Sequence, residues 1–559
     1  MTASFEPRLR QLLDRYAPGD ADAANLLCDR HPADAVAFTV VESDLSSRDL
    51  TYGYLRQESA RFAAALAGLG VEPGDAVAVL MGKSAELVIA LLGIWRRGAA
   101  HVPLFTAFAT PAITQRMQAS GARLIIADAD QAGKLAVGAD LPGEPAWQVI
   151  IANGEPGPGQ RSFTELIDAH RADEPAAASV AVGGEGTLVL LYTSGTTGTP
   201  KGVKVPLRAL ASFQAYLEIG LDVDENDVFW NAADPGWAYG LYYAILGPLA
   251  AGVRSLLLHA GFSPALTWQV IQRFGVSNFA AAPTVYRALR SEPAPAGIRL
   301  RRASSAGEPL TPEVIDWALQ HLGIPVRDHY GQTEHGMVIA NGWADPVRAE
   351  VRPGSMGRPL PGWSAAVLDD TGSHPLAPGQ VGQVAIRVAE SPLLWFTGYN
   401  DDPARTAERF SADGAYYLTG DIAAIDAEGY YFFSSRDDDV IIMAGYRIGP
   451  FDVESVLAGH PRVVEAAAIG VPDSLRGEVL EAFVVLASGD TGDEALATEL
   501  QQLVKHKFAA HAYPRTVHFV AELPKTTSGK VQRFVLRHRR RDELSSAATA
   551  TSLSEQQHR

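Results

Sequence analysis

The sequence predicts an α/β protein with a large N-terminal domain and a small α+β C-terminal domain. Its 559 residues exceed what one hydrophobic core usually organises. Residues 50–135 alternate between helical and strand-like patterns, which indicates a largely parallel sheet covered by helices. Residues 355–435 carry short alternating runs separated by TG, PG and EG turns. We therefore expect the large domain to combine parallel-sheet α/β subdomains with a β-rich subdomain.

The first α/β alternation can be followed element by element. LTYGYLRQESARFAAALAGLG (50–70) is typical of an amphipathic helix that ends at glycine. The next three segments predict a strand, a helix and a second strand, with the sequences DAVAVLM, ELVIALLGIWRRG and RLIIADAD. We expect residues 137–186 to be loop-rich. The pattern then resumes at TLVLLYTSG and continues to about residue 340.

The pattern changes again after Arg436. Three strand-like runs follow (DVIIMAG, VEAAAIGV and EAFVVLA), with one helical segment, EALATELQQLVKHKF, and a final basic stretch. We place the domain boundary at 436–439, so that residues 1–435 form the large domain and 436–545 the small one. The polar end of the chain, 546–559, has the composition of a disordered tail.

The bulk composition argues against two classes of protein. A formal net charge of −17 would repel nucleic-acid phosphates and anionic membranes. The most apolar stretches, 86–95 and 237–252, are shorter than the roughly 20 residues of a membrane span. The single cysteine, Cys28, permits no intrachain disulfide, and the start of the chain lacks a secretory signal, so we expect a cytoplasmic protein. The basic run RHRRR (537–541) is interpreted as the solvated face of a last helix.

The segment LYTSGTTGTPKG (191–202) is the sharpest chemical signal in the chain. A buried strand delivers a loop of small residues, whose backbone amides can turn toward an anion while hydroxyls and a lysine add donors and charge. It is not a Walker A loop, because Pro200 stands where a glycine belongs and Gly202 follows Lys201 in place of Ser or Thr. A flexible linker would have no reason to follow a buried strand. The candidate phosphate-binding residues are Thr193, Ser194, Gly195, Thr196, Thr197, Gly198 and Lys201.

This loop resembles the signature of the adenylate-forming superfamily, which includes acyl-CoA synthetases, luciferases and the adenylation domains of peptide synthetases. Five further motifs stand in the expected order and at the approximate spacing. The resemblance covers nearly the whole chain, from about Cys28 to Arg540. The five motifs are SAGEPL (305–310), DHYGQTE (328–334), YYLTGD (416–421), RDDDVIIMAGYRIGPFDVES (436–455) and PKTTSGK (524–530).

The resemblance implies a two-step reaction. ATP activates a carboxylic acid as its acyl-adenylate with release of pyrophosphate, and the acyl group then passes to coenzyme A with release of AMP. It also implies a Mg²⁺ ion bound with ATP. The small C-terminal domain would be mobile and would rotate between the two steps, with Asp438 at the hinge position.

The nucleotide motifs also make physical sense. Tyr330 offers a flat face for adenine, and residues 307–309 would form the opposite wall of the slot. Asp421 is a short carboxylate suited to accept from both ribose hydroxyls. Thr333 can donate to a phosphate, and Glu334 can hold the magnesium ion. The residues assigned to ATP or AMP in these motifs are Gly307, Glu308, Pro309, Asp328, His329, Tyr330, Gly331, Gln332, Thr333, Asp421, Arg436, Arg447 and Lys530.

Lys530 ends the last motif, in a Ser-Gly-Lys turn. By resemblance it bridges the substrate carboxylate and the α-phosphate, where a mobile positive charge reduces the repulsion between two anions. A carboxylic acid is already ionised at neutral pH, so no general base is needed and neither His329 nor His335 is assigned one. The catalytic set is Lys530, Thr333 and Glu334. Acetylation of Lys530 would remove its charge, so a lysine acetyltransferase and deacetylase are candidate partners.

Four residues are assigned to coenzyme A by resemblance. Ala444, Gly445 and Tyr446 would line the pantetheine tunnel, where a residue without a side chain lets the thiol arm pass. Lys505 falls where the family's acyl- and acetyl-CoA synthetases place a cation for the CoA 3′-phosphate.

The acyl pocket resembles that of the acetyl-/medium-chain acyl-CoA synthetase branch. Acetate-specific members carry a tryptophan at the position of Gly331 and a larger aliphatic residue at that of Ala306, so we expect a wider pocket here. Each substrate methylene buried in it would contribute about 0.8 kcal/mol to binding. Tyr239 would cap it at medium length or favour branched or aromatic acids. The predicted substrate is an acid longer than propionate, which indicates a role in fatty acid and lipid metabolism. The pocket residues are Trp237, Ala238, Tyr239, Gly240, Ala306 and Gly331.

Three alternatives stay open. An adenylation enzyme could load a free-standing carrier protein instead of coenzyme A. A luciferase-like oxygenase fits the acyl segment less well. A non-catalytic nucleotide-binding regulator on the same fold would be expected to lose Lys530 or Glu334, and both are present. The sequence predicts neither the oligomeric state nor the pathway.

Overall fold

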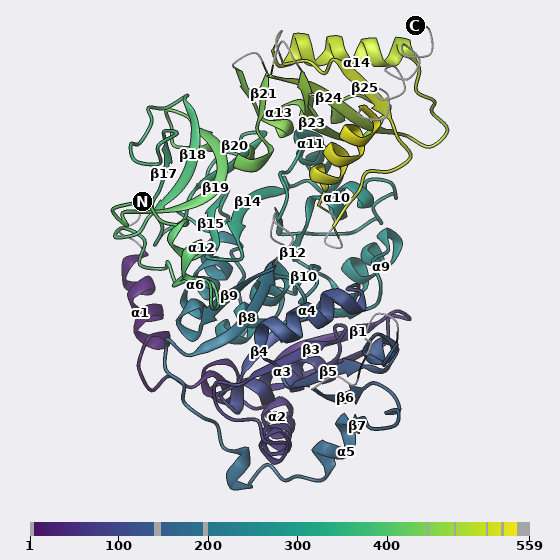
Figure 1. Cartoon of the computed structure of the whole chain (residues 1–559). Helices are drawn as coiled ribbons and strands as arrows, with labels where there is room; N and C mark the ends of the chain where they lie inside the picture. The colour runs from purple at the N-terminus through teal and green to yellow at the C-terminus, as the bar shows by residue number, and fades with distance from the viewer. Residues whose placement is uncertain are drawn as a thin grey trace, which may run out of the picture.

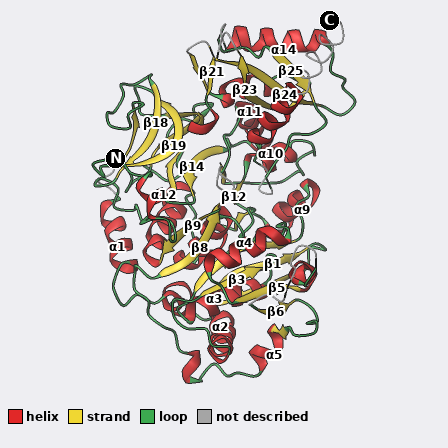
Figure 2. Ribbon diagram, viewed as in Figure 1, coloured by secondary structure: helices red, strands yellow, loops and turns green. Residues whose placement is uncertain are grey.

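The computed structural model describes residues 5–138, 143, 147–193, 200–443, 446–473, 477–509, 512–526 and 530–544. Its strands form three sheets, with helices between and around them (Figures 1 and 2). Sheets of seven and thirteen strands make up the large N-terminal part, and a five-stranded sheet makes up the small C-terminal part. The predicted α/β class is therefore confirmed. In these described ranges, no helix is both long and apolar enough to cross a membrane.

The seven-stranded sheet contains the first predicted alternation. Its strand order is β7-β6-β5-β3-β4-β8-β9, and only the β8–β9 pair is antiparallel. The first two predicted helices are present and are capped by Thr51 and Ser84, which accept from backbone amides of the first turns. The elements are β3 (Ala76–Leu80), β4 (Ala100–Pro103), β5 (Leu124–Asp128), β6 (Gln148–Ala152), β7 (Arg161–Ser162), β8 (Thr187–Thr193), β9 (Lys201–Pro206), α2 (Tyr52–Gly68), α3 (Ala85–Arg96), α4 (Thr110–Ser120) and α5 (Phe163–Asp168).

The segment 137–186 is loop-rich, as predicted, but it also contains short regular elements that the sequence pattern does not single out. β6 pairs in parallel with β5, and β7 and α5 follow it. The apolar run QVIIA is short and flanked by Gly- and Pro-rich sequence. Its assignment as a strand depends on a distant partner, β5, which local periodicity does not reveal.

The thirteen-stranded sheet carries the remaining motifs of the large part. Its order is β17-β18-β19-β20-β16-β15-β14-β13-β12-β10-β11-β1-β2. The strands from β1 through β14 are parallel, whereas those from β14 to β17 are antiparallel, which confirms the predicted β-rich segment. The strands are β1 (Val36–Glu42), β2 (Ser47–Thr51), β10 (Phe229–Asn231), β11 (Ser255–His259), β12 (Asn278–Ala281), β13 (Arg302–Ala306), β14 (Arg327–Gln332), β15 (Gly336–Ala340), β16 (Ser355–Pro359), β17 (Ala365–Leu368), β18 (Val381–Arg387), β19 (Tyr416–Ile425) and β20 (Tyr431–Arg436).

Short helices surround this sheet, and several of them belong to the acyl segment. The π-helical turns η6 (Tyr216–Gly220) and η7 (Leu241–Leu246) continue directly from α-helical turns. Wide turns of this kind often occur at functional sites. The helices are α1 (Glu6–Tyr16), α6 (Leu210–Ala215), α7 (Ala238–Gly240), α8 (Gly247–Ala251), α9 (Pro264–Phe274), α10 (Pro283–Leu289), α11 (Pro312–Leu322) and α12 (Pro403–Ala407).

The small C-terminal part lies beyond β20, next to α10 and α11 in Figure 1. The 3₁₀ turn η8 (Asp437–Asp439) separates β20 from the first strand of the five-stranded sheet, and we propose the domain boundary there. α13 packs against β20, and Ser434 Oγ donates to Asp452 Oδ2 at 2.8 Å. The elements are β21 (Ile441–Met443), β22 (Tyr446–Ile448), β23 (Val463–Asp473), β24 (Gly477–Leu486), β25 (Thr516–Phe519), α13 (Pro450–Ala458) and α14 (Glu494–Lys507).

The basic run lies on a helix, as predicted, but not on a purely solvated face. Residues 533–544 are helical. Arg537 Nη1 donates to Asp439 Oδ1 at 2.8 Å, and Arg540 Nε donates to Glu481 Oε2 at 2.7 Å. The interpretation as free surface charge is therefore corrected: two of these arginines fasten the helix to the small domain. The predicted tail, 546–559, lies outside the described residues.

Candidate active site

Three of the predicted motifs meet at Asp421, at the end of YYLTGD on β19. The carboxylate is 3% exposed. Its Oδ2 accepts from the Tyr330 hydroxyl at 2.5 Å and from Gln332 Nε2 at 2.6 Å, and Arg436 Nη1 lies 3.3 Å from Oδ1. The cross-strand pairing of Asp421 with Arg436 fixes one side of this arrangement. Tyr330 and Gln332 reach Asp421 through their side chains from β14, which is not paired with β19. The structure therefore brings together the residues predicted for adenine and ribose.

A second cluster surrounds Glu334, at the end of DHYGQTE. Glu334 is 8% exposed, and its Oε1 accepts from the Tyr399 hydroxyl at 2.8 Å. Arg409 Nε donates to the same hydroxyl at 3.0 Å, and Lys201 Nζ lies 5.4 Å from the centre of the Tyr399 ring. Burial lowers the pKa of Lys201, the neighbouring Arg409 lowers it further, and Glu334 opposes the change.

Tyr399 and Arg409 were not predicted from the sequence. They lie on either side of α12, in a segment without any recognised motif. Asn400 N donates to Gly202 O at 2.6 Å, so this segment is fastened to the strand that follows the phosphate loop. Only that pairing, which is distant in sequence, would have placed Tyr399 beside Glu334.

The two clusters concentrate positive charge around one carboxylate pair. Arg436 belongs to the first cluster, and Lys201 and Arg409 belong to the second. Arg409, Arg405 and Arg436 each lower the pKa of Lys201. A polyphosphate with a divalent cation has the charge to satisfy such a site. The loop residues Ser194, Gly195, Thr196, Thr197 and Gly198 lie outside the described residues, and Thr193 ends β8 beside them.

The GEP turn has a more specific geometry than the sequence indicates. Gly307 has φ +99°, a conformation that side chains disfavour, and a Cβ there would face open space. The Glu308 carboxylate accepts from Thr284 Oγ1 and Arg287 Nη2, each at 3.0 Å, and so faces α10. The backbone of this turn, with Pro309, is then the part available for the wall of the adenine slot.

Asp328 and His329 begin the DHYGQTE motif and are both buried. Asp328 Oδ2 accepts from Leu310 N at 3.3 Å, next to the GEP turn, while Oδ1 has no partner among the described residues. The His329 ring instead faces Tyr216, with Nδ1 2.6 Å from the tyrosine hydroxyl. Asp328 is therefore placed where an adenine ring could meet it, whereas the imidazole of His329 is turned away from that slot.

His335 behaves as the sequence suggests for a structural residue. It is fully buried, and its Nδ1 lies 2.8 Å from the Gly336 carbonyl oxygen. Burial lowers its pKa to about 4, so the ring is neutral at physiological pH. Nothing in this geometry gives it a reacting partner in the described structure.

Replacing Asp328 with Asn should flatten the pH dependence of stability. Burial raises the pKa of Asp328 from 3.8 to about 8. Between these values the unfolded chain loses a proton that the folded chain keeps, so stability falls as pH rises, by up to about 1.4 kcal/mol per pH unit. Unfolding by denaturant, measured from pH 5 to pH 8, should show this fall in wild type and less of it in Asp328→Asn. Asp369→Asn is the control, because the pKa of Asp369 is about 2 and lies below the window. Parallel curves for Asp328→Asn and wild type would refute the assignment.

The acyl segment divides between two environments. The Trp237 ring packs against Phe105 and Phe108, with ring centres 5.4 and 5.6 Å apart. Tyr239 points to the other side, 5.5 Å from Tyr243. Ala306 is buried and is the cross-strand partner of His329. The structure thus brings Tyr239 and Ala306 to the Tyr216–His329 side, and Trp237 to the first sheet.

The argument that Gly331 widens the pocket needs correction. A Cβ on Gly331 would lie 2.2 Å from the carbonyl oxygen of Gly336 on the neighbouring strand β15. A similar approach explains Gly240, where a Cβ would lie 2.1 Å from the Asp234 carbonyl oxygen. Both glycines are required by close backbone contacts, so neither reports the pocket size directly, and introducing Trp at 331 would displace a strand.

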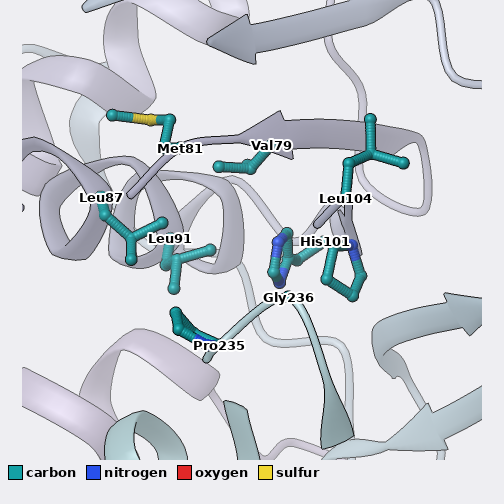
Figure 3. Close-up of a pocket in the computed structure, with 9 residues that line it drawn as sticks. Val79, Met81, Leu87, Leu91, His101, Leu104, Pro235 and Gly236 are labelled. Carbon is teal, nitrogen blue, oxygen red and sulfur yellow. The ribbon is translucent and has the colours of Figure 1, made fainter. Parts of the chain in front are cut away.

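The cavity below the start of the acyl segment is too small for a substrate. It measures ≈ 10 Å³ and lies between α3, β4 and Pro235–Gly236 (Figure 3). The His101 ring faces it, with Nδ1 unpartnered in the described structure, and burial lowers the pKa of His101 to about 3. A volume of this size suits a single water molecule, which would supply the missing hydrogen bond.

The C-terminal candidates are only partly placed. Lys530 is exposed, and its turn is closed by a bond from its amide to Thr526 Oγ1 at 3.0 Å. Lys505 lies on α14, at the outer side of the small part in Figure 1, with its ammonium 5.7 Å from the Tyr513 ring. Ala444 and Gly445 lie outside the described residues, as do the side chains of Asp438, Tyr446 and Arg447.

Two known family models match most of this chain. The family model of the AMP-binding enzymes matches residues 26–399, and that of the AMP-binding enzyme C-terminal domain matches residues 452–530. The chain belongs to the AMP-binding enzyme family. Its curated homologues are AMP-forming acyl-CoA synthetases, so the chain is an acid–thiol ligase of the adenylate-forming superfamily.

Individual relatives align with this chain over most of their own length. The acetyl-coenzyme A synthetase of Bacillus subtilis is 35% identical over 496 residues, which cover 87% of this chain and 84% of the relative. The crystal structure of Brucella canis acyl-CoA synthetase is 44% identical, with a TM-score of 0.74 and coverage of 97% and 98%. The anthranilate CoA ligase AuaEII, in complex with anthranoyl-AMP, is 28% identical, with a TM-score of 0.82 and coverage of 93% and 98%.

Proposed function

We propose that this ligase activates a medium-chain, branched or aromatic carboxylic acid longer than propionate and transfers it to coenzyme A. The observation that carries the reaction class is the meeting of Asp421, Tyr330 and Glu334 with several cations, in a chain of the AMP-binding enzyme family. The choice of a longer acid is supported by the small side chain of Ala306 and by Tyr239 on the same side of β14. ATP, a divalent cation and an ionised acid are the reactants that such a site fits.

The nucleotide would bind across β14. The Tyr330 face and the backbone of the GEP turn would hold the adenine, and Asp421 would exchange its bond from Tyr330 for bonds from the ribose hydroxyls. The unpartnered Asp328 Oδ1 is an acceptor suited to the adenine amino group. Lys201, Thr333 and Arg436 would then meet the phosphates, with the loop residues 194–198.

The donor set also fits Mg²⁺. This ion usually takes one or two protein carboxylates and completes its octahedron with phosphate oxygens and water. Glu334 provides one such carboxylate, held by Tyr399, and among the described residues no cluster of three or more metal-ligating side chains competes with it. When bound, the ion would neutralise charge on the phosphates.

The first step joins the acid to AMP. One carboxylate oxygen attacks the α-phosphorus, a new phosphorus–oxygen bond forms, and the bond to pyrophosphate breaks. Lys530 would supply positive charge to both reacting anions, which is where electrostatic stabilisation has its greatest effect. No proton has to move, because the acid reacts as its carboxylate.

The second step needs a rearranged site. The CoA thiol attacks the acyl carbon, releases its proton to solvent, and the carbon–oxygen bond to AMP breaks. Because Lys530 and the residues 444–446 belong to the same small domain, its rotation about Asp438 would exchange one set for the other. Lys505, on α14 of the same domain, would meet the CoA phosphate after such a movement.

The experiment that tests the function is a panel of acids assayed for CoA-dependent AMP formation. The panel runs from acetate to dodecanoate with branched and aryl members. We expect the highest kcat/KM for acids longer than propionate. Acid-dependent ATP–pyrophosphate exchange without CoA-dependent AMP release would instead indicate a carrier-protein loader. No exchange with any acid would indicate a nucleotide-binding regulator. A cytoplasmic location and acetylation of Lys530 by a partner enzyme remain proposals.

A further inference from the structure

The acyl side of β14 contains a connected set of polar aromatic side chains. Tyr216 and His329 share a hydrogen bond of 2.6 Å, and their rings lie 5.5 Å apart at 86°. Tyr243 packs on Tyr216 at 4.5 Å and on Tyr239 at 5.5 Å. Burial raises the pKa of Tyr239, and the nearby Tyr216 hydroxyl opposes this as a weak donor whose contact falls short of a formed hydrogen bond. These four residues are called the aromatic polar cluster below.

Strand geometry places this cluster on the acyl side and not in the adenine slot. Side chains alternate across a strand, so Asp328 and His329 point to opposite faces of β14. In the parallel register with β13, Ser305 is paired with Asp328 and Ala306 with His329. Asp328 faces the GEP turn through Leu310 N, so the opposite face, with Ala306 and His329, is the one that the acyl segment covers.

Two polar atoms of the cluster have no partner among the described residues. They are the Tyr239 hydroxyl and His329 Nε2, and His329 is 2% exposed. The neighbouring tyrosines are satisfied: Tyr242 donates to Thr333 O at 3.0 Å, and the Tyr243 hydroxyl accepts from Met337 N at 2.8 Å. Buried polar groups are rarely left unpaired, because each unmade bond costs about 1–3 kcal/mol. A bound substrate, or water in its absence, would supply the missing hydrogen bonds of the two open atoms.

The charge state of the cluster restricts what that partner is. Burial, with Arg327 as a lesser cause, lowers the pKa of His329 to about 3, so the ring is neutral at pH 7. Burial raises the pKa of Tyr239. The nearby Arg327 is committed to backbone carbonyls, including that of Gly342 at 2.6 Å. A second negative charge on the substrate would be desolvated here without a counter-ion, whereas a neutral donor or acceptor would be matched.

We propose that the acid of this ligase carries a neutral hydrogen-bonding substituent, such as a hydroxyl, keto or aromatic amino group, which Tyr239 and His329 bind. This inference rests on the proposed function and specifies its substrate class. The aromatic rings of the cluster accommodate the apolar body of the acid, and the two open atoms accommodate its polar substituent. A site built to bind a hydroxyl rejects an analogue without one much more strongly than an apolar pocket rejects an extra hydroxyl.

The test compares matched acids that differ in one group. The pairs are 3- and 4-hydroxybenzoate against the corresponding methylbenzoates, and ω-hydroxylated against unsubstituted C5–C8 acids. CoA-dependent AMP formation by wild-type enzyme should show a kcat/KM about 10²-fold or more higher for the hydroxyl member of at least one pair. Equal or higher values for the methyl and unsubstituted members throughout would overturn the proposal and leave the ligase function intact. If none of these acids supports CoA-dependent AMP formation, the proposed function is contradicted as well.

Two variants assign the preference to the cluster. Tyr239→Phe and His329→Leu should each reduce the hydroxyl-to-methyl ratio of kcat/KM by about tenfold, because the hydroxyl member loses more than the methyl member does. Tyr52→Phe is the matched control, because Tyr52 is also a buried tyrosine with an unpartnered hydroxyl, located at the start of α2. If the hydroxyl-to-methyl ratio of kcat/KM is unchanged in folded Tyr239→Phe and His329→Leu, groups other than these two side chains bind the substituent.

Discussion

Lys530→Ala should lower the rate of acyl-adenylate formation by about 10²- to 10³-fold or more, because a preorganised charge at the reacting oxygens is lost. Thioester formation from chemically prepared acyl-adenylate and CoA should survive far better, since the lysine would have left the site by then. The two half-reactions are measured separately, the first by ATP–pyrophosphate exchange and the second by AMP release. Uniform acetylation of Lys530 should mimic the alanine variant.

The control for this prediction is Lys525→Ala, in the same motif. Lys525 Nζ lies 2.7 Å from Glu465 on the small domain, so its charge is engaged away from the nucleotide. Exchange should stay close to wild type in this variant. If both half-reactions fall equally in Lys530→Ala, the account of a rotating small domain is wrong. Full activity of a uniformly acetylated sample would exclude acetylation as a switch.

Glu334→Gln should reduce kcat/KM for the first step by about 10²-fold or more and raise the Mg²⁺ concentration needed for half-maximal rate. The amide keeps the shape and can still accept from Tyr399, but it no longer offers an anion to the metal. Initial rates over a range of Mg²⁺, at saturating ATP and acid, measure both effects. Binding of ATP with and without Mg²⁺, measured by calorimetry, gives a readout independent of turnover.

Tyr399→Phe is the matched control for Glu334→Gln. It removes the hydroxyl that joins Glu334 to Arg409 but leaves the carboxylate. We expect a loss of about tenfold or less and a smaller shift in Mg²⁺ dependence, since one neutral hydrogen bond contributes about 0.5–1.5 kcal/mol. If Glu334→Gln changes rate and Mg²⁺ dependence no more than Tyr399→Phe does, Glu334 is not the metal ligand.

The sequence predicts those parts of the site that occur as contiguous motifs. DHYGQTE and YYLTGD contain Tyr330, Gln332 and Asp421, and the structure brings these side chains within hydrogen-bonding distance. Tyr399 could not be predicted in the same way. It stands in an ordinary loop, and it reaches Glu334 only because that loop pairs with residues after the phosphate loop, about 200 positions earlier.

Other features depend on backbone approach or strand direction. Gly331 resembles a pocket-widening residue in the sequence, but the structure explains it by the contact with the Gly336 carbonyl. The motif places His329 among nucleotide residues, whereas the alternation of β14 turns its ring to the acyl side. β6 was missed because its pairing with β5 is a tertiary contact. Local patterns therefore predict the elements, and the distances between them decide individual roles.

The central claim is that the acid becomes covalently linked to AMP before it reaches coenzyme A. The direct measurement uses a substrate acid labelled with ¹⁸O in both carboxylate oxygens, with ATP, Mg²⁺ and CoA. The attacking carboxylate oxygen stays on phosphorus when the thiol displaces AMP, so mass spectrometry should find one ¹⁸O in each AMP released. Unlabelled AMP, with the expelled ¹⁸O found in inorganic phosphate, pyrophosphate or water instead, would contradict an acyl-adenylate and with it the assigned roles of Lys530 and Asp421.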